Sequence, residues 1–403
     1  MEGDLDIPAI TTLIVALSVV FYLSTTLYGW YRLRHIPGPL FVSLSYTWFG
    51  FWMWRGRTTR ILGKIQRQYG PIVRIGANVV LYASVRLDPS GHNIVCEPDT
   101  ARHDARKAQL TAPYTGKRRY AGADGKVLDL SRIARYFVVD VVTAVMLGKP
   151  WGNVANETDS FQFFGMMDSR LPFVHSIAVV PSLRSFFYSP FFLSLAGPKP
   201  TDKSGIGHFI GNVLDEWLKL GITYDECQRE TLLHIPAGSE TTATAIIATM
   251  FYLLSSPPVY RKLKNEIAKG IQERRISSPI TVDEAKALPY LQAVICEGFR
   301  LASPVNSGFS KRVPAGGDAI NGIFLAGGTE IIQLKVIDLG FGHGRWMCPG
   351  KALSWVQLNK VYVELLRRFD FQIPNPDKPK RSASYQGSRI HDFWVKVTDD
   401  KLD

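Results

Sequence analysis

The sequence has few cysteines, and their positions exclude two kinds of small stabilised protein. Four cysteines in 403 residues are too few for a disulfide scaffold. No two of them form a C-x-x-C pair, which argues against a structural zinc site. Scattered thiols are typical of a reducing compartment, where a single thiol can do chemistry. The four are Cys96, Cys227, Cys296 and Cys348.

Other familiar features are also missing. The chain has no internal repeat, no low-complexity segment and no G-x-G-x-x-G or phosphate-binding loop, so a nucleotide-binding domain is not indicated. Apolar residues make up 46% of the chain, which excludes a disordered protein. Acidic residues are scarce, with 35 Asp and Glu against 47 Lys and Arg, a net charge of +12. This balance suits a nucleic acid, an anionic membrane or an acidic partner protein.

The first long apolar run predicts a membrane anchor. No residue from 7 to 31 is charged, and these 25 positions exceed the roughly 20 that a helix needs to cross a bilayer. Acidic residues precede the run and basic residues follow it, unlike a cleavable signal peptide. The positive-inside rule then places the body in the cytosol, as expected of a single-pass protein of the endoplasmic reticulum. The alternative is a buried core helix.

Residues 31–76 extend this membrane interpretation. They hold eight basic residues, no acidic one and five Trp or Phe side chains between 48 and 54, a mixture that favours contact with an anionic leaflet. A nucleic-acid partner is not expected, because no recognisable binding module surrounds the patch. Pro37-Gly38-Pro39 predicts a stiff hinge. The expected organisation is an anchor over 1–31, a hinge over 32–40 and one domain over 41–403.

The body is predicted to be mainly α with a minor β-sheet. Asp129 can cap a helix over 130–147, and Thr281 with Glu284 forms a capping box. Pro236 is expected to break a long apolar helix. The other expected helices cover 225–254, 259–274, 288–301 and 350–369, and strand pairs are expected within 72–81 and 321–332.

The strongest chemical signal is the glycine-rich loop Phe341–Gly350, which leads into a helix. Gly342 and Gly344 allow positive φ and close approach of a flat ligand. Pro349 suits a first helical turn, so Cys348 lies at a helix N-terminus that favours a thiolate. Such a thiolate is a strong axial ligand for haem iron, and Arg345 suits a haem propionate. The alternative is an inert cysteine in a tight turn.

Three motifs in order resemble one family. The loop F-G-x-G-R-x-x-C-x-G, which includes Phe341 and Gly350, resembles the haem-binding signature of the cytochrome P-450 superfamily. Upstream, 237–242 (A-G-S-E-T-T) resembles its central-helix motif, and 297–300 (E-G-F-R) its E-x-x-R motif. The anchor and the proline hinge resemble fungal microsomal members. The resemblance implies a cytochrome P-450-like fold preceded by one N-terminal transmembrane helix, with haem b bound through Cys348.

The central motif has a physical interpretation. Ala237 and Gly238 are small enough to let a planar group lie against the helix. Thr241 offers a hydroxyl for iron-bound oxygen, and Glu240 a carboxylate that can relay protons. The alternative is that the hydroxyls only bond to carbonyls one turn earlier.

E-x-x-R pairs are weak signals, because three occur and most such pairs are ordinary surface ion pairs. Glu297/Arg300 is preferred over Glu226/Arg229 and Glu364/Arg367 for its apolar helix and its place before Cys348. The resemblance implies that this pair stabilises the core behind the haem. It also suggests that His103 and Lys107 face a propionate, although a solvated basic face is an alternative.

The chain departs from the family pattern in one segment, and this departure leads to two functional hypotheses. Only 47 residues separate Arg300 from Cys348, and the meander with a Pro-Glu-Arg type motif that the family inserts there does not occur. The resemblance implies a monooxygenase that uses O₂, an NADPH-dependent reductase and an apolar substrate of terpenoid or polyketide type. The alternative is a shortened, inactive, membrane-anchored remnant that comes from splicing or a faulty gene model.

Overall fold

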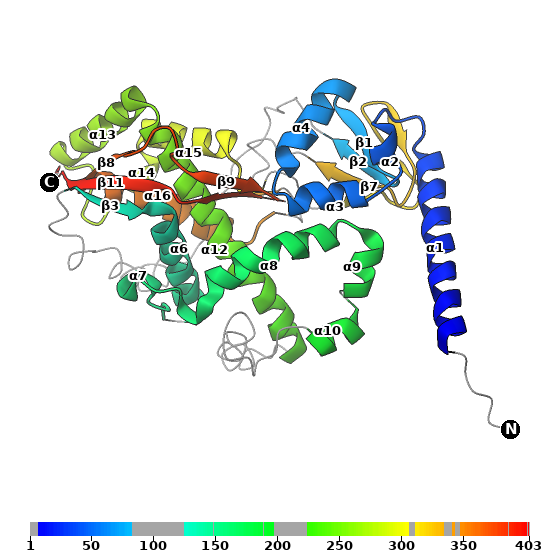
Figure 1. The fold of residues 1–403 in the computed structure, drawn as a ribbon. Coiled ribbons are helices and arrows are strands. Elements are labelled where there is room, and N and C mark those ends of the chain that lie inside the picture. The colour runs from blue at the N-terminus through cyan, green and yellow to red at the C-terminus, as the bar shows by residue number, and fades with distance from the viewer. Residues whose placement is uncertain are drawn as a thin grey trace.

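A computed structural model describes residues 7–82, 125–147, 149–187, 189–196, 224–305, 311–333, 341–342, 347–385, 387–400 and 402 (Figure 1). Helices dominate these residues, and the strands form small sheets, so the predicted mainly α architecture is confirmed. The helices around the largest core are on one side of Figure 1, and the long N-terminal helix lies beside a small sheet at the other side.

The N-terminal part consists of helices packed on a sheet. The run predicted as an anchor is the helix α1 (Ile7–Arg32). Taken one at a time over the residues that the structure describes, none of the helices meets the length and hydropathy expected of a membrane span. The short helices that follow are α2 (Leu40–Ser43), α3 (Thr47–Trp54) and α4 (Thr58–Tyr69).

A four-stranded sheet forms the other half of this part. Its strand order is β1-β2-β7-β4, with β1 and β2 antiparallel and β2 and β7 parallel. The predicted strand pair within 72–81 is therefore confirmed. The strands are β1 (Ile72–Gly76), β2 (Val79–Tyr82), β4 (Lys311–Arg312) and β7 (Glu330–Gln333).

The main core is built around one buried helix, α12 (Tyr224–Leu254). The helix packs against α6 (Leu130–Leu147), α15 (Pro289–Leu301) and α16 (Lys351–Leu366). The remaining helices of this region are α7 (Asn153–Asn156), the 3₁₀ helix Ser160–Gln162, α8 (Phe163–Ala178), α9 (Pro181–Phe187), α10 (Pro190–Ala196), α13 (Pro257–Gln272) and α14 (Val282–Lys286).

Strands near the C-terminus close the core. Strand β11 lies between β3 and β8 in a three-stranded antiparallel sheet, so residues before α6 pair with the end of the chain. Two hairpins complete the strands, β5–β6 and β9–β10. Their bounds are β3 (Lys126–Asp129), β5 (Asp318–Ile320), β6 (Ile323–Leu325), β8 (Phe369–Gln372), β9 (Arg381–Ser384), β10 (Ser388–His391) and β11 (Trp394–Asp399).

Several local predictions are confirmed. Asp129 Oδ1 accepts the Ser131 backbone N–H at 3.0 Å at the start of α6. The capping box of Thr281 and Glu284 is present, with both reciprocal hydrogen bonds. Such interactions depend on residues close in sequence, which makes them predictable.

Three predictions are wrong. Helix α12 is not interrupted at Pro236, which lies inside it. The two strands expected within 321–332 exist, but β6 pairs with β5 and β7 with β2 and β4. Pro349 precedes the N-cap of α16, Gly350, instead of lying in its first turn.

Candidate active site

The predicted ligand Cys348 lies in a tight loop just before α16. Its backbone N–H donates to the carbonyl of Phe341 at 2.6 Å, which closes the loop, and its carbonyl accepts the Lys351 N–H at 3.2 Å. Gly342 has φ of +75°, which confirms the predicted need for glycine there. The thiol is free and exposed. A Cβ at Gly350 would lie 3.7 Å from Sγ, an ordinary contact distance.

Aromatic rings tie this loop to the core. The Phe341 ring lies 5.4 Å from that of Phe299 on α15 and 5.8 Å from that of Trp355 on α16. The Phe299 and Trp355 rings are 5.9 Å apart, so the three form one cluster. Aromatic pairs at these distances add stabilisation beyond simple burial. The loop that carries Cys348 is thus anchored at its first residue and again where α16 begins.

One hydrogen bond places the central-helix motif beside this loop. Thr242 Oγ1 and Ser354 Oγ lie 2.7 Å apart and join α12 to the first turn of α16. Ser354 is six residues after Cys348, and its N–H donates to the carbonyl of Gly350 at 2.9 Å. The structure therefore brings the end of the central-helix motif to the helix that follows the cysteine loop, although Thr242 and Ser354 are 112 residues apart in sequence.

The small and hydroxyl residues of the motif have different environments. Ala237 is exposed, and Thr241 donates to its carbonyl at 2.7 Å, which is the local bond expected under the alternative interpretation. The Thr241 hydroxyl oxygen still has lone pairs with which it can accept a hydrogen bond. A Cβ at Gly238 would lie 3.3 Å from Val142 Cγ2, so the glycine there allows close packing of α12 on α6.

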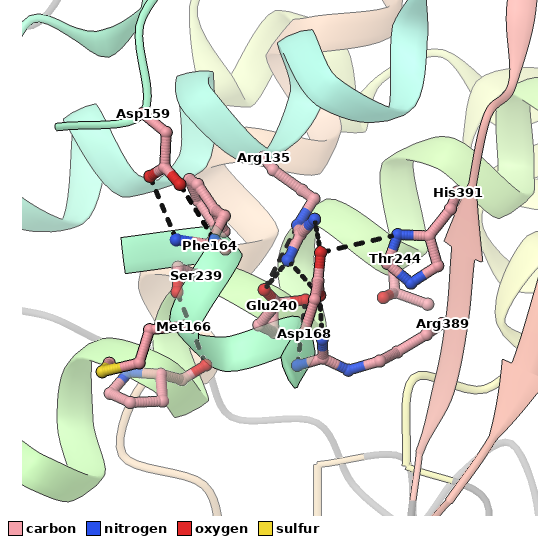
Figure 2. A network of polar contacts seen from close by, with 12 residues as sticks. Arg135, Asp159, Phe164, Met166, Asp168, Ser239, Glu240, Thr244, Arg389 and His391 are labelled. Atoms are coloured by element: carbon pink, nitrogen blue, oxygen red, sulfur yellow. Dashed lines mark hydrogen bonds and ion pairs between the residues drawn. The ribbon is translucent and has the colours of Figure 1, made fainter. Parts of the chain in front are cut away.

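Glu240 belongs to a network of charged side chains (Figure 2). Arg135 of α6 donates to Glu240 Oε1 from Nη2 at 2.7 Å and from Nε at 3.2 Å. The same guanidinium makes a two-pronged pair with Asp168 of α8, at 2.8 and 2.9 Å. Arg389 of β10 lies 2.7 Å from Asp168 Oδ1 and 3.4 Å from Glu240 Oε2. Two cations and two anions therefore meet at the middle of α12.

The pKa shifts show which members of this network stay charged. Burial by itself lowers the pKa of Arg135, but the charges of Glu240 and Asp168 outweigh it and raise the pKa. Burial raises the pKa of Asp168, but hydrogen bonds and charge from Arg135 outweigh it and lower the pKa. Burial lowers the pKa of His391, whose Nδ1 lies 3.9 Å from Asp168. Arg135 and Asp168 are thus charged at neutral pH, and His391 is neutral.

The E-x-x-R pairs differ from expectation. Glu297 and Arg300 pair with each other at 2.6 and 2.7 Å, yet their side chains are 52% and 51% exposed. Glu364 and Arg367, interpreted as an ordinary surface pair, are 5% and 2% exposed. That interpretation is wrong, because α16 is covered on nearly all sides. The side chains of Glu226 and Arg229 lie outside the described residues.

Four other candidate site residues cannot be placed. His103, Lys107, Gly344 and Arg345 lie outside the residues that the structure describes. Sequence reasoning also missed Arg135, Asp168 and Arg389, the partners of Glu240. Arg135 carried a signal, because it is one of three charged residues in a mostly apolar helix, where burial of a cation requires partners.

The comparison with sequences gives two kinds of match. The model of the cytochrome P450 family matches residues 199–337. Cytochrome P450 monooxygenase ABA1 of Pyricularia oryzae is 30% identical, with 96% of each chain covered. Cytochrome P450 monooxygenase aba1 of Botryotinia fuckeliana is 31% identical, with 91% of this chain and 92% of that one covered. Pisatin demethylase of Fusarium vanettenii is 25% identical, with 90% of each covered.

Two further findings bear on the fold and the chain length. The crystal structure of the cytochrome P450DA heme domain superposes with a TM-score of 0.56 at 13% identity, covering 74% of this chain and 73% of that one. The alignment with ABA1 runs over 491 positions, more than the 403 residues of this chain, so it contains gaps in this chain. Identity over almost the full length of these relatives leads to one conclusion: the chain belongs to the cytochrome P450 family of monooxygenases, oxidoreductases that bind haem iron through a thiolate.

Proposed function

We propose that this chain is a haem-thiolate monooxygenase that inserts one oxygen atom of O₂ into an apolar small molecule, with Cys348 as the iron ligand. The observation that carries the proposal is the free, exposed Cys348 thiol in the loop before α16, the helix that Thr242 of the central-helix motif contacts through Ser354. Among the described residues no group of three His, Cys, Asp or Glu side chains could hold a metal ion. A single thiolate suits an iron whose other ligands come from a porphyrin.

The residues fit haem in two further respects. The exposed Ala237 leaves the α12 backbone open on the side of Thr241, where a flat group could lie. The positive φ of Gly342 lets the cysteine loop turn beneath such a group. Arg345, His103 and Lys107 would hold the propionates. When bound, haem b supplies the iron at which O₂ is activated with electrons from an NADPH-dependent reductase.

The protein's own contribution is the handling of protons. Thr241 Oγ1 is held by the Ala237 carbonyl and keeps lone pairs for a second hydrogen bond. Glu240 starts as the partner of Arg135 and Arg389, so it can deliver a proton only after its carboxylate turns away from them. Arg135 then sets how readily Glu240 moves. The resemblance gives Glu297 and Arg300 a structural place behind the site, with no role in bond making.

The test compares two exposed cysteines. Full-length protein, reduced under carbon monoxide, should show the absorption band of a thiolate-ligated carbonyl complex. Cys348→Ala should abolish that band, whereas Cys296→Ala should keep it, because Cys296 is also exposed but lies on α15. A thiolate band that persists in Cys348→Ala would overturn the assignment of the ligand.

The alternative function is an inactive remnant of such an enzyme. Two observations favour it: the gaps in this chain when aligned with ABA1, and the exposure of Glu297 and Arg300. Wild-type protein that stays empty when supplied with haem, while its circular dichroism shows a helical fold, would support the remnant. Sequencing the transcript across codons 332 and 333 would show whether the short connection is genuine.

The substrate class and the cellular location form part of the same proposal. Likeness to fungal monooxygenases supports a role in secondary metabolism, with a terpenoid or polyketide substrate. The net charge of +12 suits an acidic reductase surface. Exposed apolar side chains along α1, such as Leu17, Phe21 and Leu27, support an anchor in the endoplasmic reticulum membrane.

The topology has its own test. Full-length protein should stay in microsomes after a carbonate wash, with its domain on the cytosolic side. The sequon at Asn156, exposed on α7, should then carry no glycan. A mass shift that endoglycosidase treatment removes, and that Asn156→Gln lacks, would reverse the proposed orientation.

A further inference from the structure

The end of α1 is docked on the sheet at one corner of the molecule. A Cβ at Gly29 would lie 3.1 Å from the Ala77 carbonyl, so the helix backbone touches the β1–β2 turn. The Arg74 N–H of β1 donates to the Pro37 carbonyl at 2.8 Å. The Arg32 guanidinium donates to the Gly327 carbonyl. Figure 1 shows this end of α1 beside α2, β2 and β7.

A cation without a counter-charge is buried at this corner. Arg74 is 5% exposed, and its guanidinium lies over the Trp30 ring at 5.5 Å. Nη1 donates to the Trp30 carbonyl at 3.3 Å, while Nε has no hydrogen-bond partner. No carboxylate among the described residues pairs with Arg74. A buried cation in this state is costly, and an anion in contact with it would remove much of the cost.

Two neighbouring polar atoms, like Arg74 Nε, are buried without a hydrogen-bond partner in the described part of the chain. Trp30 Nε1 is a donor that meets no acceptor. Asn78 Oδ1 is an acceptor that meets no donor, and the Asn78 Cβ would lie 3.3 Å from a Cβ at Gly29. Two donors with a positive charge suit a phosphate, and the added acceptor suits a hydroxyl or ammonium group joined to it. This combination fits a phospholipid headgroup better than free phosphate.

The surroundings fit a membrane interface. The chain has no Asp or Glu between Asp6 and Asp88, so the corner itself supplies no anion from this segment. Glu330 on β7 is already paired with Arg184 and Arg312. Arg34 lies 4.1 Å above the ring of Tyr31, and the exposed Tyr28 and Tyr31 precede the corner along α1. Aromatic and basic side chains after an apolar helix are typical of the headgroup level.

We propose that the corner formed by Arg74, Trp30 and Asn78 binds the phosphate headgroup of a membrane phospholipid, whose acyl chains lie along the apolar surface of α1. The site fixes the domain to one leaflet at a defined depth. This inference rests on the proposed membrane anchoring of α1.

The experiment measures phospholipid retained by the protein. Full-length chain is reconstituted in phosphatidylcholine vesicles with and without phosphatidylethanolamine, extracted in mild detergent and assayed for bound phospholipid by native mass spectrometry. Wild type should keep one phospholipid per chain. Arg74→Gln and Trp30→Phe should each lower its retention by about tenfold, the effect of losing one charge-assisted hydrogen bond. Arg67→Gln, an exposed arginine of α4 in the same acid-free segment, is the matched control and should behave as wild type.

The outcomes separate this inference from the anchoring itself. The same vesicles are also centrifuged in a density gradient. If the protein does not float with either kind of vesicle, the proposed membrane anchoring of α1 is contradicted. Protein that floats normally but loses no lipid in Arg74→Gln and Trp30→Phe overturns the headgroup site. If no lipid is retained but added inorganic phosphate binds and shifts its ³¹P resonance, the site binds free phosphate and the lipid proposal is overturned. Trp30→Phe keeps the aromatic ring, so it tests the site even where Arg74→Gln does not fold.

Discussion

Two pairs of residues with the same spacing have opposite environments. Glu297/Arg300 on α15 and Glu364/Arg367 on α16 are both three residues apart, and both form ion pairs. The first pair is half exposed, whereas the second is almost fully buried. Spacing along a helix thus determines that two side chains form an ion pair. The packing around the helix determines how much that pair affects the stability of the protein.

The buried pair gains further partners. Glu364 Oε1 accepts the Ile280 N–H at 2.8 Å, and Glu364 Oε2 lies 3.2 Å from Arg368 Nη2. Arg367 donates to the Ser277 carbonyl at 2.8 Å. These bonds join α16 to the loop before α14, so the pair connects two elements. In the described part of the chain, Glu297 and Arg300 contact only each other among charged groups.

The largest expected effect comes from breaking the buried pair. Glu364→Leu leaves the Arg367 guanidinium buried without its carboxylate, which should lower the free energy of unfolding by about 3–5 kcal/mol. Urea denaturation followed by circular dichroism measures the change. The double variant Glu364→Leu/Arg367→Met should recover part of the loss, because it removes the uncompensated charge. No loss in the single variant would contradict the burial of this pair.

A half-buried histidine should give a smaller, pH-dependent effect. Burial, helped by the charge of Arg389, lowers the pKa of His175 on α8 to about 4 from its ordinary 6.5. The folded state therefore favours neutral histidine, so its contribution is complete above pH 6.5 and is lost as the pH falls from 6.5 to 4. The loss should reach up to about 3 kcal/mol. His175→Gln should flatten the stability profile in this window, and an unchanged slope would contradict the shift.

The exposed pair should give the smallest effect on stability. Glu297→Gln and Arg300→Gln should leave the urea midpoint unchanged, because solvent screens both charges. The resemblance gives this pair a place in the core behind the haem. Haem content is therefore measured on the same samples to test that role separately from stability. A clear loss of stability in either variant would show that the pair is packed more deeply than its 52% and 51% exposure indicates.

These differences show what the sequence could predict. The cap at Asp129, the box at Thr281 and the positive φ at Gly342 depend on neighbours within a few residues, and all were predictable. The E-x-x-R spacing predicted the ion pairs Glu297/Arg300 and Glu364/Arg367, but it did not predict which of the two is buried. Burial depends on distant segments, such as the loop at 277–280 that covers Glu364.

The candidate site divides in the same way. The motifs around Cys348 and Glu240 were visible in the sequence, but the partners of Glu240 were not. Arg135, Asp168 and Arg389 come from α6, α8 and β10, and no local pattern brings them together. The strands β8 to β11 were also missed. All four are short, and β11 pairs with β3 and β8, which lie far from it in sequence, whereas β9 and β10 form a hairpin with each other.

The pairing of β11 with β3 has a consequence for synthesis of the protein. The first N–H of α6, on Leu130, donates to the carbonyl of Phe393 at 2.9 Å, and β3 pairs with residues 394–397. Arg389 reaches the central network from the same late stretch. A nascent chain cannot complete its central charge network while these last residues are still inside the ribosome. A premature stop codon before residue 389 would therefore damage the middle of the enzyme as well as its edge.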